Sequence, residues 1–177
     1  MTEPAENYIP SDISRHFRAQ ALRVWGVTLA GVFLWVFAIV MAPVALENGW
    51  IAISSPIYTF FSYICHQKSE RSFHFDGHSL AVCSRCFGVY FGLFTGLLAY
   101  PLWRRIEEVE PLSRFWLFLS LVPIGIDWSL TIFGIWENTH LSRFITGLIL
   151  GVACATYIVP AVVEIRRNLS LRRRMAG

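Results

Sequence analysis

Charged side chains are scarce in this sequence. Only 15% of the 177 residues are charged, 55% are hydrophobic, and the mean hydropathy is +0.50. A soluble domain carries roughly 25% charged residues. Lysine occurs once, as Lys68. So little charge, combined with long apolar runs, argues against a soluble domain and indicates a single domain that crosses a membrane several times.

The pattern of a cleavable signal sequence is also missing from the start of the chain. The first 20 residues mix three acidic side chains with Arg15 and Arg18. The apolar run that follows is longer than the about 7–15 residues of a signal peptide core. We therefore expect residues 1–20 to form a polar cytoplasmic arm, with a short helix capped by Ser11 or Asp12, and the apolar run to be a retained membrane anchor.

Four apolar segments are long enough to cross the hydrocarbon core as helices, which takes about 20 residues each. These segments are residues 21–46, 83–103, 115–136 and 141–163. Residues 50–64 are also apolar, but Ser54-Ser55-Pro56 interrupts them and they number only about 15, which favours an interfacial or re-entrant helix. The sequence predicts an all-α polytopic membrane protein, with one four-span domain over 21–163 and a Cys/His loop over 65–86.

The arginines predict the orientation of these spans. With a cytoplasmic N-terminus, 11 of the 15 basic residues fall on the cytoplasmic side, which agrees with the positive-inside rule. If residues 50–64 formed a fifth span, Arg104, Arg105 and Arg114 would lie on the opposite side of the membrane from the N-terminal arginines. This distribution conflicts with the positive-inside rule, so we reject that alternative. We expect a multi-pass protein of the cell (inner) membrane with both termini cytoplasmic, the bilayer as its partner, and a basic tail (164–177) that needs no nucleic acid.

Small residues recur every four positions in the second and fourth predicted spans. They are Gly88, Gly92 and Gly96 in one, and Gly147, Gly151 and Ala155 in the other. Residues four apart lie on one face of a helix, and a face without side chains permits close helix packing. The spacing predicts that these two spans pack against each other.

The strongest chemical signal is a group of cysteines and histidines in the loop. Cys83 and Cys86 stand three residues apart at a predicted helix start, where the helix dipole and Arg85 lower thiol pKa values. Cys65 and His66 precede them at a distance typical of the two halves of a zinc site. The sequence predicts that Cys65, His66, Cys83 and Cys86 bind zinc or a similar metal. His74, Asp76 or His78 could replace His66, and a Cys83–Cys86 disulfide is the plain structural alternative.

These motifs resemble a known family. Cys65-His66-Gln67, Glu70-Arg71-Ser72-Phe73, Gly77 and Val82-Cys83-x-Arg85-Cys86-x-Gly88-Val89-Tyr90 are similar to the prokaryotic membrane family catalogued as domain of unknown function 2085. Pro123-x-x-x-Asp127, Asn138, Arg143 and Thr146-Gly147-x-x-x-Gly151 agree with it. The resemblance covers about residues 57–151 and implies a four-span architecture, with no established activity.

Two other functions also fit these residues. A four-span chain that carries Cys-x-x-Cys where its second span begins, on the outer side, is similar to the quinone-coupled enzymes that generate disulfides. Cys83 or Cys86 would then exchange disulfides and Cys65 would resolve them. This chain departs from those enzymes because it has no second cysteine pair in a loop.

The third possibility rests on charges in or beside the membrane. Asp127 and Arg143 fall within predicted spans, where an ionisable group is usually paired or functional. We expect Arg143 to reach towards Asp127, either to fix helix packing or to line the cavity of a small transporter or lipid-headgroup binder. In that cavity Arg85 would meet the anionic group of a small molecule. Arg71 is expected to pair with Glu70 and close the loop.

Overall fold

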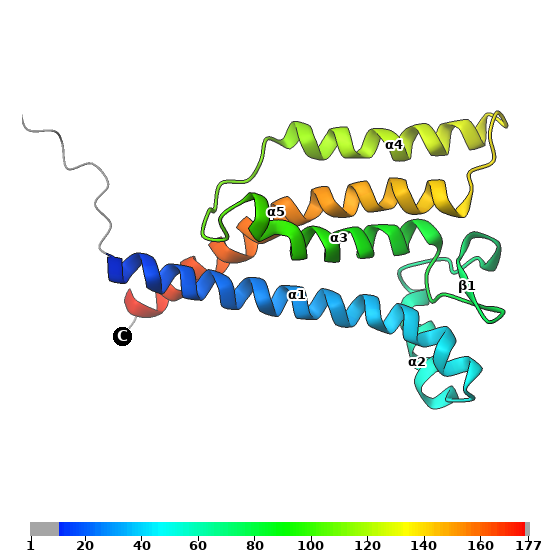
Figure 1. Ribbon diagram of the computed structural model, residues 1–177, viewed down its shortest axis with the longest axis horizontal. Helices are drawn as coiled ribbons and strands as arrows, with labels where there is room; N and C mark the ends of the chain where they lie inside the picture. Colours follow the sequence, from blue (N-terminus) through cyan, green and yellow to red (C-terminus); the bar gives the residue numbers. More distant parts are fainter. Residues whose placement is uncertain (1–10, 176–177) are drawn as a thin grey trace, which may run out of the picture.

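The computed structural model describes residues 11–175 and is built from helices that lie side by side (Figure 1). Within these residues, the α-helices are α1 (Ser11–Glu47), α2 (Ile51–Ser62), α3 (Ser84–Trp103), α4 (Arg114–Ile132) and α5 (His140–Met175). A 3₁₀ turn (Ser69–Arg71) and a two-stranded hairpin, β1 (His74–Phe75) and β2 (His78–Ser79), connect α2 to α3. The hairpin and α2 lie together at one end of the bundle (Figure 1).

Four of these helices, α1, α3, α4 and α5, are long and apolar enough to cross a membrane, whereas α2 is too short. The predicted all-α polytopic architecture, including the short helix after the first span, is confirmed. Two helices extend well beyond their predicted spans, α1 at its start and α5 at its end. The helix α1 begins at Ser11 and absorbs the short helix expected there, and α5 continues through most of the basic tail to Met175. Residues 1–10 of the arm and 176–177 of the tail lie outside the described residues.

The start of α1 and the end of α5 lie at the same end of the bundle (Figure 1). The guanidinium of Arg167 stands 5.6 Å from the centre of the Phe17 ring, a cation–π contact between the two helices. An even number of spans requires this arrangement. The Cys/His loop is therefore at the opposite end from both of these helix ends.

The helices α3 and α5 make the closest contact in the bundle, and glycine makes it possible. A Cβ added at Gly88 would overlap the backbone of Phe144, and one added at Gly92 would overlap Leu148. In the other direction, a Cβ at Gly151 would overlap the backbone of Val89. The predicted packing of the two small-residue faces is confirmed, with the backbones themselves in contact.

The helix α1 lies against this pair, whereas α4 is peripheral. Ala21 of α1 packs with Leu97, Tyr100 and Val159, and the Trp25 Nε1 donates a hydrogen bond to the Leu97 carbonyl at 2.9 Å. The helix α4 packs mainly against α5 and exposes many large apolar side chains, among them Phe115, Phe118, Ile126, Trp128 and Ile132. Such a surface is suited to contact with lipid, which makes the bilayer a partner of this protein.

The turn after α1 sends the chain back along that helix. The helix α1 ends at Glu47, as the turn residues after it predicted, and Gly49 adopts a positive φ of +72°. The helix α2 then packs against α1, where the Trp35 ring meets the Phe61 ring at a centroid distance of 5.2 Å. This hairpin of helices delivers Cys65 to a buried position beside Ile39 of α1.

Replacing Gly92 by alanine tests the α3–α5 contact. The new methyl group would overlap the Leu148 backbone, and overpacking of this kind costs about 1–3 kcal/mol. We expect a clear fall in the Tm of the purified protein in detergent. The matched control is Gly26→Ala in α1, where nothing lies within 4 Å of an added Cβ. There, alanine should leave Tm unchanged or raise it, because alanine favours a helix by about 1 kcal/mol over glycine. Equal effects of the two substitutions would refute the contact.

A candidate metal centre

Two of the three candidate thiol ligands lie at the start of α3. Cys83 is the residue before the helix, with extended backbone angles (φ −66°, ψ 159°), and no side chain caps the helix there. The Cys83 carbonyl accepts a hydrogen bond from the Phe87 N–H at 2.9 Å, which begins the helical pattern. Cys86 lies three residues further on, and this spacing brings both thiols to the same side of the first turn.

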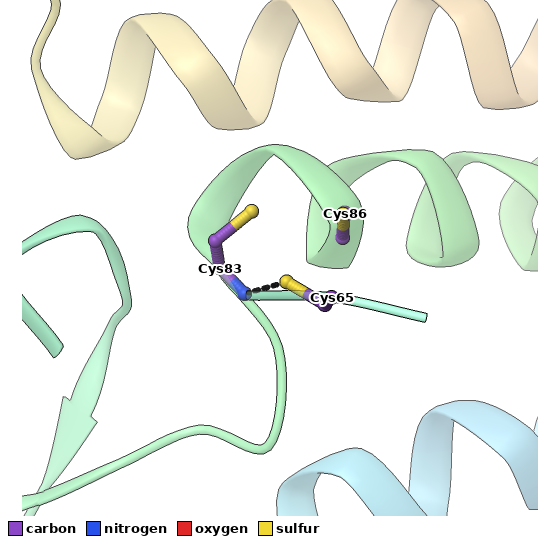
Figure 2. A group of neighbouring side chains, drawn as sticks. All are labelled: Cys65, Cys83 and Cys86. Carbon is purple, nitrogen blue, oxygen red and sulfur yellow. Dashed lines mark hydrogen bonds between the residues drawn. The ribbon is translucent and has the colours of Figure 1, made fainter. Parts of the chain in front are cut away.

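The loop brings Cys65 to these two cysteines. The Cys83 backbone N–H donates a hydrogen bond to the Cys65 Sγ at 3.2 Å, which Figure 2 shows as a dashed line. The sulfur atoms of Cys65, Cys83 and Cys86 all lie within 4.8 Å of one another. The expectation that these three cysteines converge is met, although Cys65 and Cys83 stand 18 residues apart in the chain.

Gln67 holds the two ends of the loop together. Its side-chain Nε2 donates hydrogen bonds to the carbonyls of Tyr58, in α2, and Ala81, just before α3, both at 2.8 Å. The backbone of Gln67 takes a positive φ of +46°, which is uncommon for a residue with a Cβ. The sequence identifies Gln67 only as part of the Cys-His-Gln motif. It does not predict these hydrogen bonds, because it does not indicate which partners an amide side chain will bind.

The middle of the loop is a small hairpin that the sequence did not predict. Asp76 and Gly77 both have positive φ, +45° and +82°, as the turn of a two-residue hairpin requires. Gly77 therefore serves the turn, as expected. His78 anchors the hairpin to the end of α1, because its Nε2 lies 3.1 Å from a carboxylate oxygen of Glu47.

No histidine joins the sulfur cluster in the described part of the chain. The predicted ligand His66 is exposed although its neighbour Cys65 is buried, since adjacent side chains in this non-helical stretch point in different directions. The alternatives are engaged elsewhere: the His74 ring lies 2.9 Å from the Ser69 hydroxyl, and His78 pairs with Glu47. Among the described residues, the close group of potential metal ligands consists of the three cysteines alone.

The cluster is well suited to hold a soft metal ion. All four cysteines of the chain are free thiols, so the alternative disulfide between Cys83 and Cys86 is not formed, and Cys154 lies apart in α5. The Cys83 and Cys86 thiols, together with the backbone N–H of Cys83 and Gln67, lower the pKa of Cys65 well below the usual range of a thiol, despite burial. Zinc–sulfur bonds of about 2.3 Å place tetrahedral sulfur ligands roughly 3.8 Å apart, which the cluster accommodates. Three protein sulfurs leave a fourth position open.

Arg85 lies between Cys83 and Cys86 in the chain, and its guanidinium group pairs with the carboxylate of Asp127. The Arg85 Nη2 and the Asp127 Oδ2 form a charged hydrogen bond between α3 and α4, and the Asp127 side chain is only 8% exposed. The expected reach of Arg143 towards Asp127 is indirect. Asn138, in the connection between α4 and α5, separates them: its Nδ2 donates to Asp127 at 3.0 Å, and its Oδ1 accepts from the Arg143 Nε at 2.6 Å.

The expected closure of the loop by Glu70 and Arg71 is not seen either. The ion pairs of the described residues are His78–Glu47, Arg85–Asp127 and Arg104–Glu108. Neighbouring residues in the 3₁₀ turn cannot easily turn their side chains towards each other. Arg71 is exposed, two residues before Phe73, whose ring packs against His140 at the start of α5.

Residues 65–157 match the family described as predicted membrane protein (DUF2085). An uncharacterized protein of Methanocaldococcus jannaschii is 34% identical over 143 residues, which cover 78% of this chain and 92% of the relative. Another uncharacterized protein, from Methanothermobacter thermautotrophicus, is 40% identical over 97 residues, 54% of this chain and 84% of the relative. No solved structure matches.

The matched residues begin at Cys65 and include the three cysteines, Gln67, Asp127 and Asn138. The helices after the loop also fall within them, up to the middle of α5. By this match, and by the relative that shares a third of its residues over most of the chain, the protein belongs to the predicted membrane protein family DUF2085.

Proposed function

We propose that this membrane protein binds zinc or a similar thiophilic ion through Cys65, Cys83 and Cys86. The observation that carries the proposal is the convergence of three free thiols within 4.8 Å, in a loop built to hold them. Gln67 ties the loop ends together, and Cys65 is buried, so the sulfurs are placed before any metal arrives. A preformed site of this kind loses little entropy on binding.

The open fourth position decides what such a site would do. A structural zinc site is closed by four protein ligands, whereas a catalytic or transfer site keeps one position for water or an exchangeable ligand. Three thiolates and one Zn²⁺ carry a net charge of −1, and an exchangeable fourth ligand would complete the tetrahedron. Three sulfurs therefore favour exchange or chemistry at the ion over a purely structural role.

We also propose that the site faces the extracytoplasmic side of the cell membrane, with the N- and C-termini in the cytoplasm. The support is the arginine distribution together with the position of the loop, which lies at the opposite end of the bundle from the start of α1 and the end of α5 (Figure 1).

Replacing single cysteines tests the metal site. We expect protein purified without chelator to contain about one zinc per chain, since three sulfurs share one ion. Cys65→Ser, Cys83→Ser and Cys86→Ser should each lower the affinity for zinc by more than the 10–100-fold that loss of an outer-shell partner typically costs. Cys154→Ser is the control. Because Cys154 lies in α5, outside the cluster, this substitution should leave the zinc content unchanged. Metal analysis of the four variants, with a zinc-competition titration, gives the measurement. Reduced wild-type protein with no transition metal would rule the proposal out.

Proton release on zinc binding tests the electrostatics of the cluster. An unperturbed thiol has a pKa of about 8.5, so each is mostly protonated at pH 7. Because the pKa of Cys65 is lowered, that thiol is already ionised, and fewer than three protons should leave per zinc bound at pH 7. Calorimetry in buffers of different ionisation enthalpy measures this number. A release of about three would contradict the lowered pKa.

The same shift fixes the sign of a pH effect on the metal-free protein. The folded pKa of Cys65 lies below its unfolded value of about 8.5. Ionised Cys65 therefore stabilises the fold fully above about pH 8.5, and this contribution is lost as the pH falls towards the folded pKa.

Single cysteines introduced at exposed positions test the orientation. In a chain whose native cysteines are replaced by serine, Lys68→Cys should react with a membrane-impermeant maleimide in intact cells. Arg105 is exposed in the connection between α3 and α4, which lies at the other end of the bundle (Figure 1), so Arg105→Cys should react only after the membrane is opened. Labelling of Arg105→Cys alone in intact cells would reverse the proposed orientation.

A second candidate function is a membrane thiol oxidoreductase coupled to quinone. The low pKa of Cys65 and its proximity to Cys83 favour it, because a thiolate attacks a disulfide more readily than a thiol does. Thiol trapping in intact membranes separates the two functions. A Cys83–Cys86 disulfide that an added quinone regenerates supports the oxidoreductase, whereas three reduced thiols that a chelator exposes support the metal site.

A further inference from the structure

Three arginines gather on the side of the loop that faces α4 and α5. Arg85 lies in the first turn of α3 and Arg143 in the first turn of α5. Arg71 comes from the loop, where Phe73, two residues later, packs its ring 5.8 Å from the rings of both His140 and Phe144. Arg85 and Arg143 both connect to Asp127, Arg85 directly and Arg143 through Asn138. Segments far apart in the chain thus bring these arginines to the same end of α3 and α5.

The positive charge of this group exceeds the negative charge that the protein supplies. Asp127 is the one carboxylate bound into the group among the described residues, through Arg85 and Asn138. Glu70 and Glu137 are close to members of the group in the chain, but both are exposed and neither forms an ion pair in the described part of the chain. Three guanidinium groups and one carboxylate leave a net charge of about +2. The neighbouring cysteine cluster carries about one negative charge, as the Cys65 thiolate or as three thiolates on Zn²⁺, so about +1 remains, which favours an anion.

Hydrogen-bond donors also remain in the group. The Arg85 Nε is buried and has no acceptor in the structure, a costly state for a charged group. The Arg143 Nε bonds Asn138, and no acceptor within the described residues engages the Arg71 side chain. In addition, the N-termini of α3 and α5 both point here, and each adds partial positive charge.

We propose that Arg71, Arg85 and Arg143 form a binding site for a phosphate group, carried by a lipid headgroup or by free phosphate, beside the cysteine cluster. Guanidinium groups bind phosphate through paired N–H donors, which three converging arginines supply. Asp127 and Asn138 hold Arg85 and Arg143 in position, so both are oriented before the anion binds. Arg71, exposed on the loop, closes over the bound group.

The position of the site along the membrane normal allows the phosphate to come from a lipid headgroup or from solution. Arg85 and Arg143 begin two membrane-spanning helices, so they stand at the level where the apolar core gives way to headgroups. A phospholipid whose chains lie along the exposed apolar face of α4 would bring its phosphate to this level. A free phosphate would reach the same arginines from the aqueous side, past the loop.

The test uses the full chain purified in a maltoside detergent, which contains no phosphate. One arm titrates inorganic phosphate and follows binding by calorimetry. The other titrates phosphatidylglycerol and counts bound lipid by native mass spectrometry. We expect about one equivalent of one of these probes to bind, and Arg71→Gln to weaken that binding about ten- to a hundredfold, because each charge-assisted contact is worth that much.

Lys68→Gln is the matched control, since it removes one positive charge from the same exposed loop without touching the group. It should bind the probe as the wild type does, and both variants should keep the wild-type Tm and zinc content. Binding of phosphatidylglycerol alone identifies a lipid site, and binding of inorganic phosphate identifies a soluble ligand. The proposal is overturned if neither probe binds, or if Arg71→Gln binds as tightly as Lys68→Gln. Because zinc content is measured separately, a chain without zinc that still binds phosphate would reject the metal site and leave this one standing.

Discussion

The backbones of α3 and α5 touch, and almost every other feature of the site depends on that contact. In a membrane no hydrophobic driving force draws one apolar helix to another, so close packing has to supply the attraction. Bare Cα atoms at Gly88, Gly92 and Gly151 permit it. Because the two helices meet from their first turns onward, Arg85 and Arg143 begin at the same level, and the loop can lie across both.

Both ends of the loop are buried in an apolar cluster with Ile39 of α1 and Phe61 of α2, and hydrogen bonds fix the geometry of the loop. Gln67 bonds two carbonyls from opposite ends of the loop, and the Cys83 N–H bonds the Cys65 sulfur. Each such bond contributes about 0.5–1.5 kcal/mol net, but leaving one partner buried without the other costs more. The arrangement therefore favours one geometry strongly, and that geometry is the one in which the three sulfurs converge.

The sequence was sufficient for the features that follow from periodicity and composition. Runs of apolar residues located the spans, the four-residue glycine spacing identified the α3–α5 pair, and the three cysteines were expected to meet. The sequence was insufficient where the direction of a single side chain decides which residues contact each other. His66 follows Cys65 in the chain yet is exposed, and Asp127 binds Arg85, 42 residues away, instead of the nearer Arg143. Asn138 occurred in a noted motif, but its bridging position depends on where α4 ends, which no pattern in the sequence defines.

Arg85 connects the sulfur cluster mechanically to the membrane. It lies between Cys83 and Cys86 in the chain, and its guanidinium is bonded to Asp127 on α4. The helix α4 is the one held least by its neighbours and most exposed to the surrounding lipid. The position of α4 would therefore be coupled, through Asp127 and Arg85, to the helical turn that carries two of the three sulfurs.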